Sequence, residues 1–446
     1  MTGTNDTIYA LSSGAGRAGV AVIRLSGSRA GDALETLAGT LPPPRRASLR
    51  RLRHPLSREE LDRALVLWFP GPGSVTGEDV VELHVHGGRA VIAGLLDALG
   101  GMEGLRLAEA GEFARRAFEN GRIDLTQVEG LADLIDAETA AQRRQALRQS
   151  AGSARGRFED WRERLLRAQA LVEAALDFSD EPDVPANVAS EASGIATIVC
   201  NEIGAVLATG AGAERLREGF RVVLAGAPNA GKSSLLNALA GCDAAIVSTE
   251  AGTTRDVIEV HLELRGWPAV VMDTAGIRAA RGGVEAEGIR RTLARAADAD
   301  LVLWIIDLTA PEWVPDLRLS GGHAQVLLVA NKSDLASPAP PPGVNLWLTL
   351  SASTGAGLAA LESGLADRAA TFLEGAEEAV VTRSRHRQEL SACRAALKRF
   401  GAGSWQDLEL RAEDLRMASR ALGRITGASD VEDILDRLFA EFCIGK

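Results

Sequence analysis

The sequence has few of the features that anchor, export or cross-link a protein. Its four cysteines, Cys200, Cys242, Cys393 and Cys443, lie at separations that match no metal-ligand spacing. No apolar run approaches the ~20 residues that a membrane-spanning helix requires. No Lys or Arg precedes Arg17, which argues against a secretory signal or an organelle transit peptide. We therefore expect a protein of the reducing cytoplasm, where disulfides are rare.

The acidic balance of the chain limits its binding to nucleic acid. The formal net charge is −11, which disfavours indiscriminate attraction to a polyanion. Any contact with RNA must then come from a local basic patch or from a partner. One candidate is "RSRHRQELSACRAALKRF" (383–400), which is helical in pattern, although a solvated helix face is the simpler interpretation.

The pattern of apolar residues changes three times along the chain. Residues 1–118 contain short β-type runs and turn signals, and residues 119–215 have mainly helical periodicity. Residues 216–378 alternate between strand and helix patterns, which predicts a mainly parallel sheet covered on both faces. Residues 379–446 are helical again. We expect an N-terminal α+β domain, then a discontinuous helical domain in two segments, with an α/β domain inserted between them.

The strongest single motif lies in "RVVLAGAPNAGKSSLLNALAG" (221–241). A buried strand leads into Gly-Ala-Pro-Asn-Ala-Gly-Lys-Ser and then into a helix, which is the phosphate-loop pattern in its required context. The backbone N–H groups of such a loop surround phosphate oxygens at the positive end of the helix. Lys232 is expected to reach the β- and γ-phosphates, and Ser233 to bind Mg²⁺. The inserted domain is therefore expected to be a Ras-like P-loop domain.

Three further motifs complete the pattern of a GTP site. "VVMDTAG" (270–276) supplies Asp273, a carboxylate near magnesium, and Gly276, whose N–H can sense the γ-phosphate. Asp334, which ends "NKSD", can accept two hydrogen bonds from guanine N1–H and its 2-amino group. Adenine cannot supply these donors, and a buried carboxylate left unpaired rejects ATP. "LSAST" (350–354) is expected to supply a backbone contact to guanine O6. Four motifs in this order predict GTP binding.

The switch regions narrow the class of GTPase. "AGTTRD" (251–256) is a switch segment in which Thr254 can bind Mg²⁺ in the γ-phosphate state. Ile277 stands where Ras-like enzymes carry the glutamine that orients water, so water must be oriented otherwise. Asn229 offers an oxygen where a cation can sit beside the phosphates. Glu285 either positions water from a distance or is only an acidic residue at a helix start.

Together with a C-terminal FCIGK, these motifs resemble the tRNA modification GTPase family known as MnmE or TrmE. The resemblance covers the whole length of the chain. Its other signatures are "GRAGVAVIRLSG", "LWFPGPGSVTGEDVVELHVHGG" and "GEFARRAFENGRIDLTQVEGLADLI".

The resemblance implies a specific activity. The N-terminal domain of such proteins binds 5-formyl-tetrahydrofolate or a related one-carbon donor and forms a constitutive homodimer. With an FAD-containing partner (MnmG), in a heterotetramer or larger complex, it modifies C5 of the wobble uridine (position 34) of certain tRNAs. The group installed is aminomethyl or carboxymethylaminomethyl, with nitrogen from ammonium or glycine. Two GTPase domains meet across K⁺, which serves in place of an arginine finger.

The resemblance also assigns roles to residues of this chain, with catalytic roles for Glu285, as the water-orienting carboxylate, and for Cys443. The expected folate contacts are Arg24, Glu82, Arg122 and Lys446; the family often has Lys at position 122, and Arg keeps the charge with a different donor geometry. The expected K⁺ ligands are Asn229, Ser248, Glu250 and Thr253, and the expected Mg²⁺ ligands are Ser233 and Thr254. The GTP-binding set is Asn229, Ala230, Gly231, Lys232, Ser233, Ser234, Ser248, Thr249, Glu250, Ala251, Gly252, Thr253, Thr254, Asp273, Thr274, Ala275, Gly276, Asn331, Lys332, Asp334, Ser351 and Ala352.

Cys443 has three possible roles. The tail Cys-Ile-Gly-Lys has the outline of a lipidation box, but a terminal Lys does not fit one, and no polybasic run precedes it. The cysteine can instead be a buried space-filler. In the family the matching cysteine is required for modification, and a direct role as a base or a transient nucleophile on C5/C6 of uridine is one interpretation of that requirement. That role requires a pKa lowered by neighbours such as Lys446.

Two other hypotheses concern the strand at 80–88. Glu82, His84 and His86 share one strand face and can be read as metal ligands, but only His86 belongs to the family pattern. The rival function from another class is a ribosome-assembly GTPase that only switches, without a folate domain or a need for Cys443. A membrane-associated switch fails on the chemistry of the tail. Folate binding by residues 1–120 separates the two main hypotheses.

Overall fold

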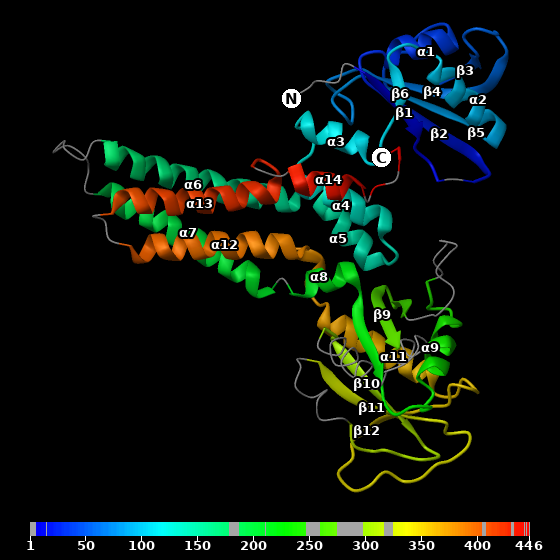
Figure 1. Cartoon of the computed structure of the whole chain (residues 1–446), viewed down its shortest axis with the longest axis vertical. Coiled ribbons are helices and arrows are strands. Elements are labelled where there is room, and N and C mark those ends of the chain that lie inside the picture. The colour runs from blue at the N-terminus through cyan, green and yellow to red at the C-terminus, as the bar shows by residue number, and fades with distance from the viewer. Residues whose placement is uncertain are drawn as a thin grey trace, which may run out of the picture. The chain divides into compact units, whose positions relative to one another are not determined.

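The computed structural model divides into two compact units, residues 1–132 with 422–446, and residues 133–421. The residues that the structure describes are 6–14, 16–177, 187–209, 211–246, 259–273, 298–315, 324–403, 407–429, 432–440, 442 and 444–445 (Figure 1). The domain boundaries expected at 118, 215 and 378 stay a prediction.

The first unit is built on a six-stranded sheet with the order β3-β4-β5-β2-β1-β6. Its neighbouring strands are antiparallel except for the parallel pair β1 and β6. The strands are β1 (Thr7–Leu11), β2 (Ala18–Ser26), β3 (Ser48–Arg53), β4 (Glu60–Phe69), β5 (Val80–Gly87) and β6 (Leu105–Leu107).

Two helices, α1 (Ala30–Ala38) and α2 (Arg89–Gly100), pack on the core face of this sheet (Figure 1). Along β5 the side chains of Val81, Leu83 and Val85 are buried in that core, whereas Glu82 and His84 alternate with them and are only partly buried. The alternation seen in the sequence therefore corresponds to a half-buried strand, because successive side chains point to opposite faces.

The chain end joins the first unit through a small helical core. Helices α3 (Glu112–Glu119) and α4 (Leu125–Asp136) pack with α14 (Glu432–Ala440). A reciprocal cap begins α4, because Gln127 N donates to Asp124 Oδ1 at 2.8 Å and Asp124 N donates to Gln127 Oε1 at 3.2 Å. The buried members of this core are Ala114, Leu125, Val128, Leu435, Leu438, Phe439 and Phe442.

The second unit contains long helices that pack lengthwise. Its helices include α5 (Ala140–Ser150), α6 (Ser153–Asp177), α7 (Asn187–Thr209), α8 (Ala211–Glu218) and α12 (Ser384–Ala402), followed by α13 (Leu408–Thr426). Phe158 and Trp161 of α6 are fully buried, and the Phe158 ring meets the buried His386 ring edge-on at 6.1 Å.

One segment of α7 differs from the expectation about apolar runs. Ser190–Ala208 is, by length and composition alone, apolar enough to cross a membrane, with a mean hydropathy of 1.3. The expectation that no run approaches that length was wrong. This is weak evidence for a membrane span, because core helices pass the same test. Here α7 packs against α6 and α12 and buries Ala192, Ala196, Val199 and Ile203.

The second sheet carries the P-loop and confirms the prediction of a mainly parallel sheet. Its order is β12-β11-β10-β7-β9-β8, parallel throughout except for the antiparallel pair β8 and β9. Buried clusters cover both faces, and α9 (Lys232–Ala240) and α11 (Leu358–Phe372) contribute to one of them. The strands are β7 (Phe220–Ala225), β8 (Glu259–Leu264), β9 (Trp267–Asp273), β10 (Leu301–Asp307), β11 (Gln325–Asn331) and β12 (Leu346–Thr349).

Candidate functional site

The phosphate loop joins the end of β7 to the start of α9. Gly231 precedes the helix with φ of 92°, and a Cβ there would lie 2.3 Å from Asn331 Nδ2, so only glycine fits. Asn229 also has a positive φ, 65°, which asparagine tolerates better than most residues. The backbone of the loop is therefore curled as phosphate binding requires, with the exposed Asn229 side chain at its tip.

Lys232 and Ser233 begin α9 and face the ends of neighbouring strands. Lys232 is 6% exposed, and its Nζ donates to the carbonyls of Gly226 at 3.0 Å and Ala227 at 2.8 Å. Ser233 Oγ donates to Asp273 Oδ2 at 2.5 Å, and Asp273 is buried at the end of β9. The structure thus brings together the two residues that the sequence placed near magnesium.

Asn331 connects the phosphate loop to the loop that follows β12. It is 2% exposed; its Nδ2 donates to Ala230 O at 2.9 Å, and its Oδ1 accepts from Ala352 N at 3.0 Å. Lys332, beside it, pairs with Asp307 Oδ2 at 2.6 Å. The side-chain amide of Asn331 therefore holds the phosphate loop and the loop after β12 together, because its nitrogen and its oxygen each bond to the backbone of one of these loops.

Asp334 is held by two hydroxyl groups. Ser351 Oγ donates to Asp334 Oδ1 at 2.5 Å and Ser353 Oγ donates to Oδ2 at 3.2 Å. The hydrogen bond from Ser351 lowers the pKa of the Asp334 carboxyl, which is therefore ionised and only accepts. The expectation that this carboxylate is buried was wrong, because it is exposed at the end of its loop. Discrimination between guanine and adenine by Asp334 therefore depends on the fixed position of its two carboxylate oxygens.

Part of the predicted site lies outside the described residues. The hypotheses about K⁺ ligation, the switch segment, water orientation and the terminal groups stay predictions there. These residues are Ser248, Thr249, Glu250, Ala251, Gly252, Thr253, Thr254, Thr274, Ala275, Gly276, Glu285, Cys443 and Lys446.

In the first unit, the structure pairs Arg24 with Glu82. The two residues are directly opposite on β2 and β5, and Arg24 Nη2 lies 2.9 Å from Glu82 Oε1. His84 Nε2 lies 3.3 Å from the other oxygen of Glu82. The Arg24 guanidinium also lies 5.8 Å from the centroid of the Phe113 ring. The site therefore places a cation beside a carboxylate, with the face of a buried aromatic ring against the cation.

The other residues predicted near this site are placed differently. Arg122 is exposed and packs next to Gly77, with its backbone N donating to Ala117 O at 2.8 Å. His86 does not share Glu82 with His84, because its Nδ1 lies 2.7 Å from Asp62 Oδ1 on β4.

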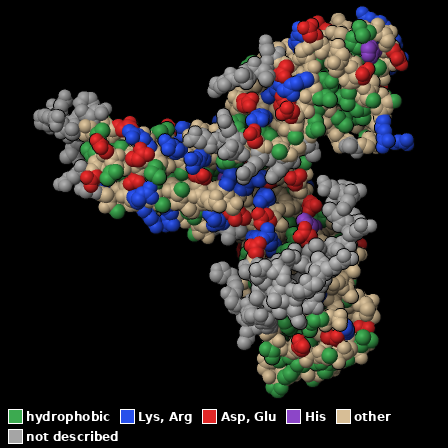
Figure 2. Space-filling model, in the orientation of Figure 1, with side chains coloured by type: hydrophobic (Ala, Val, Ile, Leu, Met, Phe, Trp, Pro, Cys, Tyr) green, Lys and Arg blue, Asp and Glu red, His purple; other side chains and the backbone are tan. Residues whose placement is uncertain are grey.

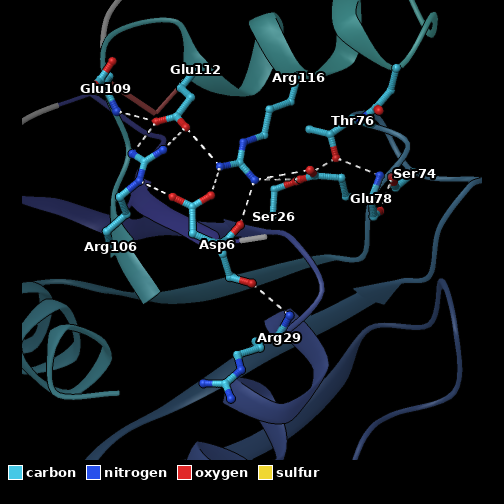
Figure 3. Close-up of polar contacts among 12 residues, drawn as sticks. Asp6, Ser26, Arg29, Ser74, Thr76, Glu78, Arg106, Glu109, Glu112 and Arg116 are labelled. Atoms are coloured by element: carbon cyan, nitrogen blue, oxygen red, sulfur yellow. Dashed lines mark hydrogen bonds and ion pairs between the residues drawn. The ribbon is translucent and has the colours of Figure 1, made fainter. Parts of the chain in front are cut away.

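Sequence reasoning missed a buried ionic cluster next to this site. Figure 3 shows the guanidinium group of Arg116, whose side chain is 6% exposed, between three carboxylates. Its Nη2 lies 2.9 Å from Asp6 Oδ1 and 3.0 Å from Glu112 Oε1, and its Nη1 lies 3.2 Å from Glu78 Oε2. Arg106 bonds both Asp6 and Glu112 at 2.5 Å. The only signal in the sequence was the Glu112/Arg116 spacing of one helical turn.

This ionic cluster joins segments that are distant in the sequence. Asp6 precedes β1, Arg106 lies on β6, Glu112 and Arg116 lie on α3, and Glu78 lies in the loop before β5. Burial raises the pKa of the Asp6 and Glu112 carboxyls, but hydrogen bonds from Arg106 and Arg116 outweigh it and lower both pKa values. The cluster therefore fixes α3, and with it the Phe113 ring, against the sheet.

The end of the chain returns to the same region. Phe442 packs against Phe439 with ring centroids 6.0 Å apart, and Ile444 forms an antiparallel bridge with Ala110. Gly445 lies against the backbone of Leu11, at the end of β1. The residues on both sides of Cys443 are thus docked on the first unit.

Comparison with known proteins covers the whole chain. The family model "MnmE helical domain" matches residues 125–443, and the model "GTP-binding protein TrmE N-terminus" matches residues 7–122. A protein of Parvibaculum lavamentivorans named "tRNA modification GTPase MnmE" is 53% identical over 449 residues, with 99% of this chain and 100% of that protein covered. Its namesake in Methylorubrum populi is 55% identical, with coverages of 99% and 98%. That of Paramagnetospirillum magneticum is 53% identical, with coverages of 99% and 100%.

Proposed function

The chain belongs to the MnmE family of tRNA modification GTPases, and from that membership we propose that it is a K⁺-dependent GTP hydrolase acting on the wobble uridine. With an FAD-containing MnmG-type partner it installs an aminomethyl or carboxymethylaminomethyl group at C5, using a tetrahydrofolate one-carbon donor. The observation that carries this proposal is the match to named relatives along 99% of the chain. A cytoplasmic location fits a tRNA substrate.

The nucleotide site supports the hydrolytic half of the proposal. The Lys232 ammonium, now on two loop carbonyls, can move to phosphate oxygens because it has three donors on a flexible stem. Ser233 and Asp273, at 2.5 Å from each other, are the described residues that would hold Mg²⁺. Mg²⁺, when bound, neutralises charge that develops on the phosphates.

Potassium selectivity and guanine selectivity rest on different parts of this site. We infer that the exposed amide of Asn229, at the tip of the phosphate loop, supplies an oxygen to K⁺. Glu285 is proposed to orient the attacking water, in place of the glutamine that Ile277 replaces. Asp334, ionised and held by two hydroxyl groups, is an acceptor suited to the two donors on the guanine edge.

The Arg24–Glu82 pair supports a folate site in the first unit. Folates carry carboxylates that favour a guanidinium and a pterin edge whose N–H donors favour a carboxylate. The buried Phe113 ring, whose centroid lies 5.8 Å from the Arg24 guanidinium, helps to hold that side chain in place. The side chains of Arg24 and Glu82 are 25% and 20% exposed, so a ligand can reach them.

The same sheet face supports a homodimer. Leu49 and Leu65 are directly opposite on β3 and β4 and are 66% and 47% exposed, and Val20 is 57% exposed. Figure 2 shows hydrophobic side chains on the visible face of this unit. A sheet with exposed apolar side chains opposite its core face is expected to be covered by another layer. We propose that a second copy of this chain is that layer.

The test is nucleoside mass spectrometry of tRNA from a bacterial strain that lacks its own family member. The strain is complemented with wild type or with Cys443→Ser. The proposal expects that wild type restores the C5-modified wobble uridines and that Cys443→Ser does not. If the modified nucleosides persist in the strain without any copy, tRNA modification is the wrong assignment. A ribosome-assembly defect in that strain would then support the rival function.

A further inference from the structure

Gly445, the last residue that the structure describes, lies against the backbone of Leu11 and Ser12. We propose that Gly445 is a positioning residue: its contact with Leu11 holds the C-terminal segment beside the Arg24–Glu82 pair. The part of this inference that concerns chemistry rests on the proposed function. The part that concerns docking of the segment stands on geometry alone.

The contact leaves no room for any side chain at position 445. Gly445 is buried and has φ of 101°. A Cβ there would lie 2.2 Å from Leu11 O, 2.9 Å from Leu11 C and 3.0 Å from Ser12 Cα. These are backbone atoms of a paired strand end, so they cannot rotate away as a flexible side chain would. An L-alanine would also be strained at this φ, since only glycine adopts it freely.

Ile444 and Phe442 also hold the C-terminal segment against the first unit. Ile444 bridges Ala110, which lies between β6 and α3, although its own side chain is 61% exposed. Phe442 is 7% exposed in the core formed by α3, α4 and α14. The exposed Ile444 side chain adds little burial, so docking beyond Phe442 depends on backbone contacts. Gly445 against Leu11 is one of these backbone contacts, and the bridge between Ile444 and Ala110 is the other.

The register of the sheet places this contact beside the proposed folate site. Leu11 is opposite Ile23, and Ala10 is opposite Arg24, in the β1–β2 pair. Arg24 is in turn opposite Glu82 on β5. Gly445 therefore touches the strand position next to the row that contains the Arg24–Glu82 pair. If Gly445 leaves Leu11, the C-terminal segment loses its contact next to this row.

The experiment uses the cysteine itself as a ligation point. Residues 1–442, prepared as a thioester, are joined to synthetic Cys-Ile-Gly-Lys, and the native bond at Cys443 restores the full chain. Two further peptides carry Gly445→Ala with L-alanine or with D-alanine. D-alanine favours positive φ and directs its methyl group to the opposite side of the backbone. It therefore replaces glycine by a residue of the same composition as L-alanine, without placing a methyl group against Leu11.

Docking is measured by hydrogen exchange in the peptides that contain Ala110 and Ile444. We expect exchange to be about tenfold faster with L-alanine, as local opening increases, and close to the glycine chain with D-alanine. Gly39→Ala is the matched control, because Gly39 also has positive φ, 89°, but a Cβ there meets nothing within 4 Å. That control is expected to leave exchange at Ala110 and Ile444 unchanged.

Modification of tRNA by the three ligated chains tests the consequence. We expect about a tenfold or greater loss with L-alanine and recovery with D-alanine. Unchanged exchange with L-alanine would overturn the docking contact. Faster exchange with full modification would overturn the positioning role. If even the glycine chain modifies no tRNA, the proposed function fails, while the exchange result still decides the docking contact.

Discussion

Replacing Arg116 by methionine tests the ionic cluster of the first unit. Methionine fills much of the same space but removes the guanidinium that contacts Asp6, Glu112 and Glu78 at 2.9, 3.0 and 3.2 Å. Breaking a buried ion pair by removing one partner costs about 3–5 kcal/mol. Arg106 still bonds two of the three carboxylates, and Asp6 and Glu78 are 26% and 25% exposed. We therefore expect the free energy of unfolding of this unit to fall by about 3 kcal/mol, the lower end of that range.

The assay must report on the first unit alone, because a chain with two compact units need not unfold in one transition. Native-state hydrogen exchange of peptides from β1 and β2 measures the free energy of opening of that unit. The matched control is Arg63→Met in the same unit, since Arg63 pairs with Glu60 at 2.8 Å but is 60% exposed. Such an exposed pair contributes little to stability, so Arg63→Met should leave the free energy of opening nearly unchanged.

The effect should also depend on pH with a definite sign. The pKa values of Asp6 and Glu112 are lowered in the folded state, because the guanidinium groups outweigh burial. Their contribution is therefore fully present above the unfolded pKa values, roughly 4, and is lost as the pH falls through the lower folded values. The difference in the free energy of opening between wild type and Arg116→Met should therefore become smaller as the pH falls through that range. A loss below ~1 kcal/mol at neutral pH, or a difference that does not narrow in acid, would refute this reasoning.

Three further predictions address the nucleotide site and the sheet face. Asp334→Asn should weaken GTP binding by about a hundredfold or more, because an amide donor faces the guanine donors; isothermal titration checks this, and equal affinity would contradict it. Asn229→Gly removes the side-chain oxygen but keeps the positive φ, so hydrolysis in K⁺ should fall to the rate in Na⁺; a K⁺-stimulated rate that survives would exclude Asn229 as a ligand. Leu65→Glu should give a monomer by light scattering at micromolar concentration, with Leu56→Glu, exposed in a turn, as the control; a dimer in both would place the interface elsewhere.

The described part of the nucleotide site could be predicted from local motifs in the sequence. Asp273 and Asn331 end β9 and β11, and Lys232 begins α9 after the loop that follows β7; parallel strands bring those three strand ends to one edge of the sheet. Local motifs therefore predicted a site that is not local in space. The exposure of Asp334 was missed, because solvent access depends on how its loop lies.

The first unit depended on tertiary structure. Arg24 and Glu82 were predicted together through resemblance, but their direct pairing follows from the register of β2 and β5. Arg116 and Asp6 are 110 positions apart, and no periodicity links residues at that distance. Gly445 is an ordinary glycine in the sequence, and only the approach of Leu11 shows that a side chain cannot fit there. Motifs encode chemistry within one loop or strand end, whereas contacts between distant segments are decided by packing of the whole unit.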